Sequence, residues 1–104
     1  MSELPEPYQR FLRDFPEVGA AYEKLGEAAH EHGPLDRKTR ELVKLGMAMG
    51  AWLEGGVHSH VRRALAAGAT PEEIRHVVQL AVPTIGFPAT VAVYTWVNDV
   101  LDSP

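Results

Sequence analysis

Two residues suited to proton transfer, Glu41 and His60, stand on neighbouring stretches of helical apolar periodicity. Imidazole is the side chain that gains and loses a proton most readily near neutral pH, and a carboxylate beside it can orient the ring. A pair of this kind is typical of acid/base chemistry. The alternative is a buried polar pair that only fixes how two helices pack.

The elements that must position this pair are two helices joined by a turn that contains glycines, around residues 53–56. The first helix runs to about Gly50. Its apolar stripe consists of Leu42, Leu45, Met49 and, just beyond the helix, Trp52. The stripe of the second helix, which ends at Gly68, consists of Leu53, Val57, Val61, Ala64 and Leu65, with His60 as its polar member. Steps of three and four residues predict an antiparallel helix hairpin with one buried seam.

The position of the helix break decides whether Glu41 and His60 can meet. With a break near Gly50 and a new helix from about Leu53, Glu41 lies roughly 13 Å before the turn and His60 roughly 10 Å after it, at about 1.5 Å per residue. The difference is less than one helical turn, so we expect contact, directly or through a water molecule. A break at Gly55 would separate the pair by several turns.

Three residues near the turn are candidate substrate-binding residues: Glu54, His58 and Gly56. Glu54 could reach the same pocket as His60, and free amides at the glycines could bind an anion. His58 lies about 200° around the helix from His60, so a surface or subunit-interface position is its alternative. A metal site of Glu54, His58 and His60 is also open, but the two histidines of H-x-H diverge on a helix. We therefore expect no metal and no cofactor.

A longer run of residues resembles the carboxymuconolactone decarboxylase and alkylhydroperoxidase D-like family. The resemblance covers about residues 35–97, and its segments are Arg40-Glu41-Leu42, His60-Val61-Arg62, Ala64-Leu65, Gly68-Ala69-Thr70, Glu72-Glu73-Ile74 and Gly86-Phe87-Pro88-Ala89. The peroxidase branch of that family carries C-x-x-C-x-x-x-H downstream of a glutamate. Here Leu53 and Gly56 stand at the cysteine positions, and Glu41 stands at the glutamate position.

The resemblance implies an all-helical fold, assembly as trimers or hexamers, and a site at Glu41 and His60. Peroxidase chemistry needs a thiolate and a second thiol, and the chain has no cysteine. The decarboxylase branch has no cysteine pair, so a lyase that acts on a small carboxylate or lactone is the favoured function. A non-catalytic oligomer of the same family is the alternative.

Length and composition set the remaining expectations. A chain of 104 residues predicts one domain, residues 1–104, and its net charge of −4 gives no basic surface for nucleic acid or acidic membranes. No apolar run approaches the length of a membrane span, and no leader precedes the first helix, so we expect a cytoplasmic protein. A small-molecule ligand remains open as a partner.

The other predicted helices are 5–15, 17–30, 71 to about 82, and 88 or 89–101, which gives six in all around the hairpin. The second is expected to bury Val18, Ala21, Tyr22, Leu25 and either Ala28 or Ala29, and the fifth to end where Pro83 begins a bend. The last helix is apolar around most of its circumference, so it must be covered on more than one side. Self-association into a homo-oligomer, a hexamer or a trimer, is therefore predicted.

Overall fold

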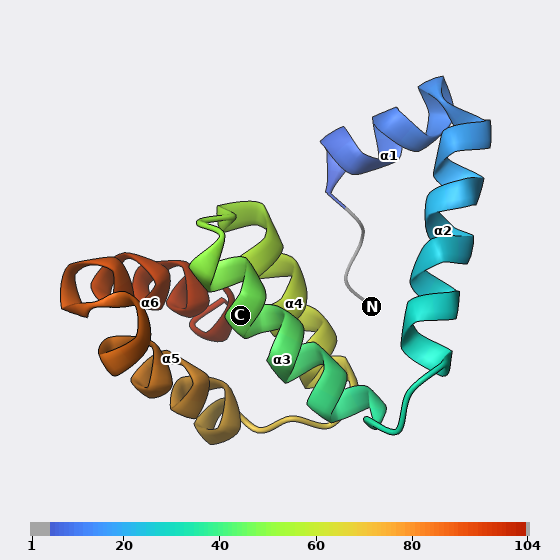
Figure 1. Cartoon of the computed structure of the whole chain (residues 1–104). Coiled ribbons are helices and arrows are strands. Elements are labelled where there is room, and N and C mark those ends of the chain that lie inside the picture. The colour runs from blue at the N-terminus through green and yellow to red at the C-terminus, as the bar shows by residue number, and fades with distance from the viewer. Residues whose placement is uncertain (1–4, 104) are drawn as a thin grey trace. The chain divides into compact units, whose positions relative to one another are not determined.

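The computed structural model describes residues 5–103, and within them the chain forms six helices and no strand, as predicted (Figure 1). The helices are α1 (Glu6–Asp14), α2 (Pro16–Glu31), α3 (Arg37–Gly50), α4 (Glu54–Ala66), α5 (Pro71–Ile85) and α6 (Phe87–Leu101). Their contacts divide the chain into two compact units, Met1–Pro34 and Leu35–Pro104. That the whole chain is a single domain therefore stays a prediction.

The first unit consists of α1 and α2, which pack on each other through Leu12 and Gly19. A side-chain carbon on Gly19 would lie 2.5 Å from Leu12 Cδ2, so the Leu12 side chain would have to move to admit it. Gly19 is the one buried residue of α2, whereas Val18, Tyr22 and Leu25 are exposed. The predicted burial of these three side chains and of Ala21, Ala28 and Ala29, which are also exposed, is wrong, because a pair of short helices has too little surface to cover the stripe.

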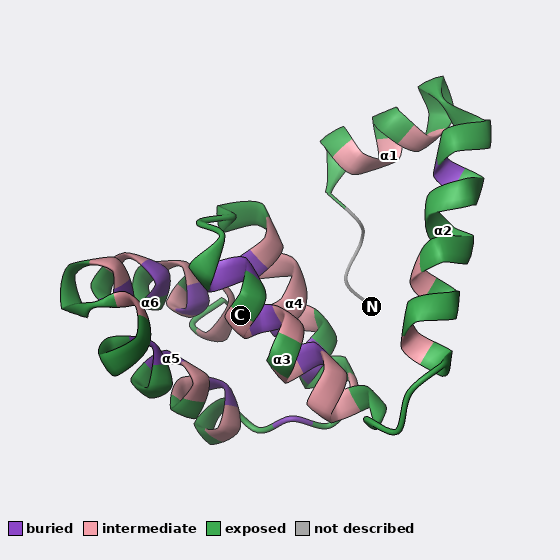
Figure 2. Ribbon diagram, viewed as in Figure 1, coloured by how far each residue is buried: buried purple, intermediate pink, exposed green. Residues whose placement is uncertain are grey.

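The second unit consists of α3 to α6 and holds the buried core. α4 packs against both α3 and α6, and α5 packs against α3 and α6. The largest fully buried side chains are Leu45, Met49, Val57, Val61, Ile74, Val93 and Val97. Buried positions lie on the facing sides of these four helices (Figure 2). The stripes predicted for the hairpin supply the first four of the seven, but their members Trp52, Leu53 and Leu65 are exposed.

Local signals explain where the helices begin and end. Asp36 accepts a hydrogen bond from the Thr39 amide and caps α3, and Thr70 with Glu73 forms the capping box of α5. The predicted end of α5 near Val82 is wrong, because the helix continues through Pro83 to Ile85. Pro83 removes one amide donor from the last turn of α5, and the helix ends two residues later, where Gly86 at φ 95° follows it.

The turn of the hairpin lies where it was predicted. α3 ends at Gly50 and α4 begins at Glu54, and Trp52 adopts the left-handed conformation with φ 62°. This conformation is rare for a bulky residue, and the Trp52 ring packs edge-on against Trp96 at 4.9 Å between centroids. Across residues 5–103, no helix is long and apolar enough to span a membrane.

Candidate functional site

Glu41 and His60 meet across the seam between α3 and α4. His60 Nδ1 lies 2.9 Å from Glu41 Oε1. An ionised carboxylate only accepts hydrogen bonds, so Nδ1–H donates and Nε2 carries the free lone pair of the neutral ring. The predicted contact is confirmed, and it is direct. The pair has the geometry of a histidine that is oriented by a carboxylate.

The two members of the pair differ in their access to solvent. The side chain of Glu41 is 7% exposed and that of His60 is 17% exposed. Apolar residues of the core surround the seam, among them Leu45, Val57 and Ala64, all fully buried. The imidazole is therefore the member that solvent or a small molecule can reach, while the carboxylate is held behind it.

The other polar candidates form a second cluster at the start of α4. His58 Nε2 lies 3.0 Å from Asp99 Oδ2 on α6, and one ligand atom from each of Glu54, His58 and Asp99 falls within 4.8 Å of the others. His60 is not a member, so the alternative metal set of Glu54, His58 and His60 is wrong in its third residue. The physical reason is the helical divergence of positions 58 and 60. Asp99 was missed because only tertiary packing brings α6 to this end of α4.

Gly56 has a packing role in the structure. A side-chain carbon there would lie 3.2 Å from Leu53 Cβ and 3.3 Å from Ala48 Cβ. These separations are tighter than ordinary contacts, so glycine lets the first turn of α4 approach α3. A substrate-binding role for Gly56, Glu54 or His58 stays a prediction.

A groove of about 540 Å³ lies between α3 and α5, and sequence analysis did not predict it. Its lining is mostly apolar, and the residues are Thr39, Leu42, Val43, Gly46, Met49, Gly50, Glu73, His76, Val77, Leu80, Ala81, Thr84 and Ile85. Neither Glu41 nor His60 belongs to this lining. At its edge, Lys38 Nζ donates to Glu73 Oε2 at 3.0 Å.

The electrostatics at this edge favour the ionised form of Glu73. The backbone amide of Thr70 and then the ammonium of Lys38 hold the pKa of Glu73 below its usual value. The pKa of Asp36 is lowered in the same way, chiefly by the hydrogen bonds from Thr39. Asp36 and Glu73 both take part in helix caps, so both pKa shifts are consequences of the fold.

The sequence and the fold were compared with those of known proteins. The sequence model of the Carboxymuconolactone decarboxylase family matches residues 16–99, which is most of the chain. The chain belongs to this family. A solved carboxymuconolactone decarboxylase family protein from Legionella pneumophila, in its apo form, has the same fold with a TM-score of 0.79. The two are 24% identical, and the match covers 92% of this chain and 85% of that one.

Two curated proteins are similar in sequence to this chain. An uncharacterized protein from Haemophilus influenzae is 33% identical over 63 residues, which cover 61% of this chain and 56% of the relative. A protein from Metarhizium robertsii named nitrosuccinic acid decarboxylase is 40% identical over 74 residues, which cover 65% of this chain and 50% of the relative. The matches thus span about half the length of each relative.

Proposed function

We propose that this chain is a lyase of the decarboxylase type that acts on a small carboxylate or lactone, with His60 and Glu41 as its proton-transfer pair. The observation that carries the proposal is the 2.9 Å hydrogen bond between His60 Nδ1 and Glu41 Oε1. Family membership supports it. So does the relative from Metarhizium robertsii that is named nitrosuccinic acid decarboxylase.

The reaction requires one proton donor placed close to the reacting carbon. In a decarboxylation, the bond between the carboxylate carbon and its neighbour breaks, CO₂ leaves, and the electron pair stays on the neighbouring carbon. That carbon then takes a proton, which the protonated ring of His60 donates from Nε2. The ring recovers a proton from solvent, so one proton is consumed for each CO₂ released.

Glu41 acts on this reaction through His60. Its carboxylate accepts the hydrogen bond from Nδ1–H, which fixes the ring orientation and directs Nε2 away from α3. Its negative charge also stabilises the imidazolium form that donates the proton. In this proposal His60 is the catalytic residue and Glu41 is a positioning residue.

The test is CO₂ release from a panel of small carboxylic acids with an electron-withdrawing group next to the carboxylated carbon, with nitrosuccinate as the first member. We expect His60→Ala and Glu41→Gln to lower turnover by about 10²-fold or more, as the loss of general acid catalysis does. His32→Ala, at the exposed residue that follows α2, is the control and should retain full turnover. Unchanged turnover in His60→Ala would contradict the proposal.

A second candidate is a non-catalytic oligomeric family member, in which the pair only fixes packing. The observation that favours it is that the groove between α3 and α5 is lined by neither Glu41 nor His60. Under this candidate no panel member releases CO₂, and the pair matters for stability alone. The panel should first be screened for compounds that raise the melting temperature of the chain, so that CO₂ release is measured with compounds that bind.

A further inference from the structure

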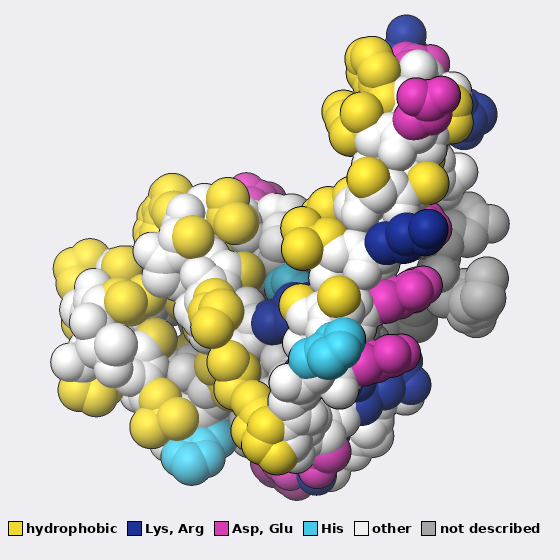
Figure 3. Space-filling model, turned by 45° about the vertical axis from the view of Figure 1, so that its right-hand side comes forward, with side chains coloured by type: hydrophobic (Ala, Val, Ile, Leu, Met, Phe, Trp, Pro, Cys, Tyr) yellow, Lys and Arg dark blue, Asp and Glu magenta, His cyan; other side chains and the backbone are white. Residues whose placement is uncertain are grey.

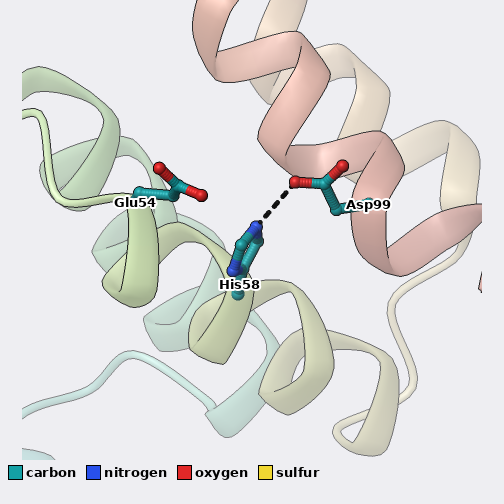
Figure 4. A group of neighbouring side chains, drawn as sticks. All are labelled: Glu54, His58 and Asp99. Atoms are coloured by element: carbon teal, nitrogen blue, oxygen red, sulfur yellow. Dashed lines mark hydrogen bonds and ion pairs between the residues drawn. The ribbon is translucent and has the colours of Figure 1, made fainter.

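We propose that Glu54, His58 and Asp99 form a binding site for one divalent transition-metal cation, with zinc as the best fit. The three side chains come from the first turns of α4 and the last turns of α6 (Figure 4). Glu54 and His58 are four residues apart on a helix, so they share one face. The imidazole points at Asp99, and the Glu54 carboxylate lies beside both.

The distances suit an ion between the three groups. One ligand atom from each residue lies within 4.8 Å of the others, and His58 Nε2 is 3.0 Å from Asp99 Oδ2. Zinc binds nitrogen and carboxylate oxygen at about 2.0–2.2 Å, so ligand atoms around one ion lie roughly 3–4 Å apart. Glu54 is exposed, so rotation about its side-chain bonds can bring the carboxylate into range.

The donor set selects the class of cation. Two carboxylates with a neutral imidazole carry a charge of about −2, which a dication neutralises. Carboxylates alone would suit magnesium or calcium, whereas an imidazole nitrogen shifts the preference to first-row metals such as zinc. Water completes the coordination.

The proposed site is separate from the Glu41–His60 pair, because the two histidines leave α4 on different sides. In the structure His58 Nε2–H donates to Asp99, and a bound cation takes the place of that proton. The ion would then tie the start of α4 to the end of α6. Since a ligand that binds only the folded chain stabilises it, we expect zinc to raise the melting temperature.

Isothermal titration of the untagged chain with ZnCl₂ tests the site. We expect one zinc per chain, and an affinity lowered at least tenfold in His58→Ala and in Asp99→Asn. MgCl₂ should bind more weakly than ZnCl₂ by a similar factor. Circular dichroism shows whether these variants fold. If they fold poorly, Glu54→Gln replaces them in the test, because Glu54 is the exposed first residue of α4.

The chain supplies a matched control on α5. Glu72 and His76 repeat the spacing of Glu54 and His58, yet the structure brings no third ligand to them among the described residues. His76→Ala should therefore bind zinc as tightly as the parent chain. Zinc binding that survives His58→Ala and falls in His76→Ala would overturn the assignment. Absence of zinc binding to the parent chain, or magnesium binding of equal strength, would also overturn it.

Discussion

At the scale of single residues, Glu41 is the unusual feature of this core. The carboxylate is buried among aliphatic side chains and forms a hydrogen bond with His60. A buried charge is tolerated when it is paired, and it becomes costly when its partner is removed. The pair therefore has a structural consequence whether or not it also transfers protons.

We predict that His60→Ala destabilises the chain by about 3–5 kcal/mol, because it leaves the Glu41 carboxylate buried without its partner. Glu41→Gln should cost much less, since the amide oxygen can still accept from Nδ1–H. Urea unfolding measures both. The double variant Glu41→Gln/His60→Ala should recover part of the loss of the single His60 variant. Equal stability of His60→Ala and the parent chain would show that water reaches the carboxylate.

At the scale of elements, the hairpin turn determines the site, and two adjacent glycines allow a matched test. We predict that Gly56→Ala destabilises the chain by about 1–3 kcal/mol, because the new methyl group lies 3.2 Å from Leu53 Cβ and 3.3 Å from Ala48 Cβ. Gly55→Ala meets nothing within 4 Å and lies in the same helix. It should be neutral or stabilising in thermal denaturation. A destabilised Gly55→Ala would indicate that the turn itself needs flexibility.

The capping box of α5 makes a prediction about acid. Because the pKa of Glu73 is lowered in the fold, its contribution to stability is present above its usual value of 4.5 and is lost as pH falls through the lowered value. Glu73→Gln removes this titration. The melting temperatures of the parent chain and Glu73→Gln should therefore differ most near neutral pH and converge in strong acid. A difference that persists in strong acid would contradict the ionic origin.

Sequence reasoning succeeded where local rules decide and failed where tertiary packing does. The break between α3 and α4 follows from residue type and spacing, and it was enough to predict the Glu41–His60 contact. The pairing of His58 with Asp99 depends on how α6 packs on α4, which no local rule gives. The exposure of α2 was missed for the same reason, since periodicity reveals an apolar stripe and not what covers it.

At the scale of the whole molecule, the described residues expose many large apolar side chains. Figure 3 shows groups of hydrophobic side chains on the surface. On α6 the exposed members are Phe87, Val91 and Tyr94, which recur at helical spacing and form one stripe. Another side of α6 is buried through Val93 and Val97. The chain thus has a packed core and, on α6, a further apolar face that is exposed.

We predict that the chain is a homo-oligomer, a hexamer or a trimer, in which the exposed stripe of α6 is buried between subunits. Phe87, Val91 and Tyr94 are 66%, 47% and 45% exposed. Covering such side chains contributes about 25 cal/mol for each Å² removed from water, which favours association of a small domain. Light scattering at micromolar concentration should give a multiple of the 11.4 kDa chain mass.

Val91→Glu should lower that mass because it places a charge in the apolar contact, whereas Gln79→Glu, at an exposed position of α5, should not. A parent chain that scatters as a monomer would contradict the prediction and would leave the apolar stripe of α6 exposed to solvent.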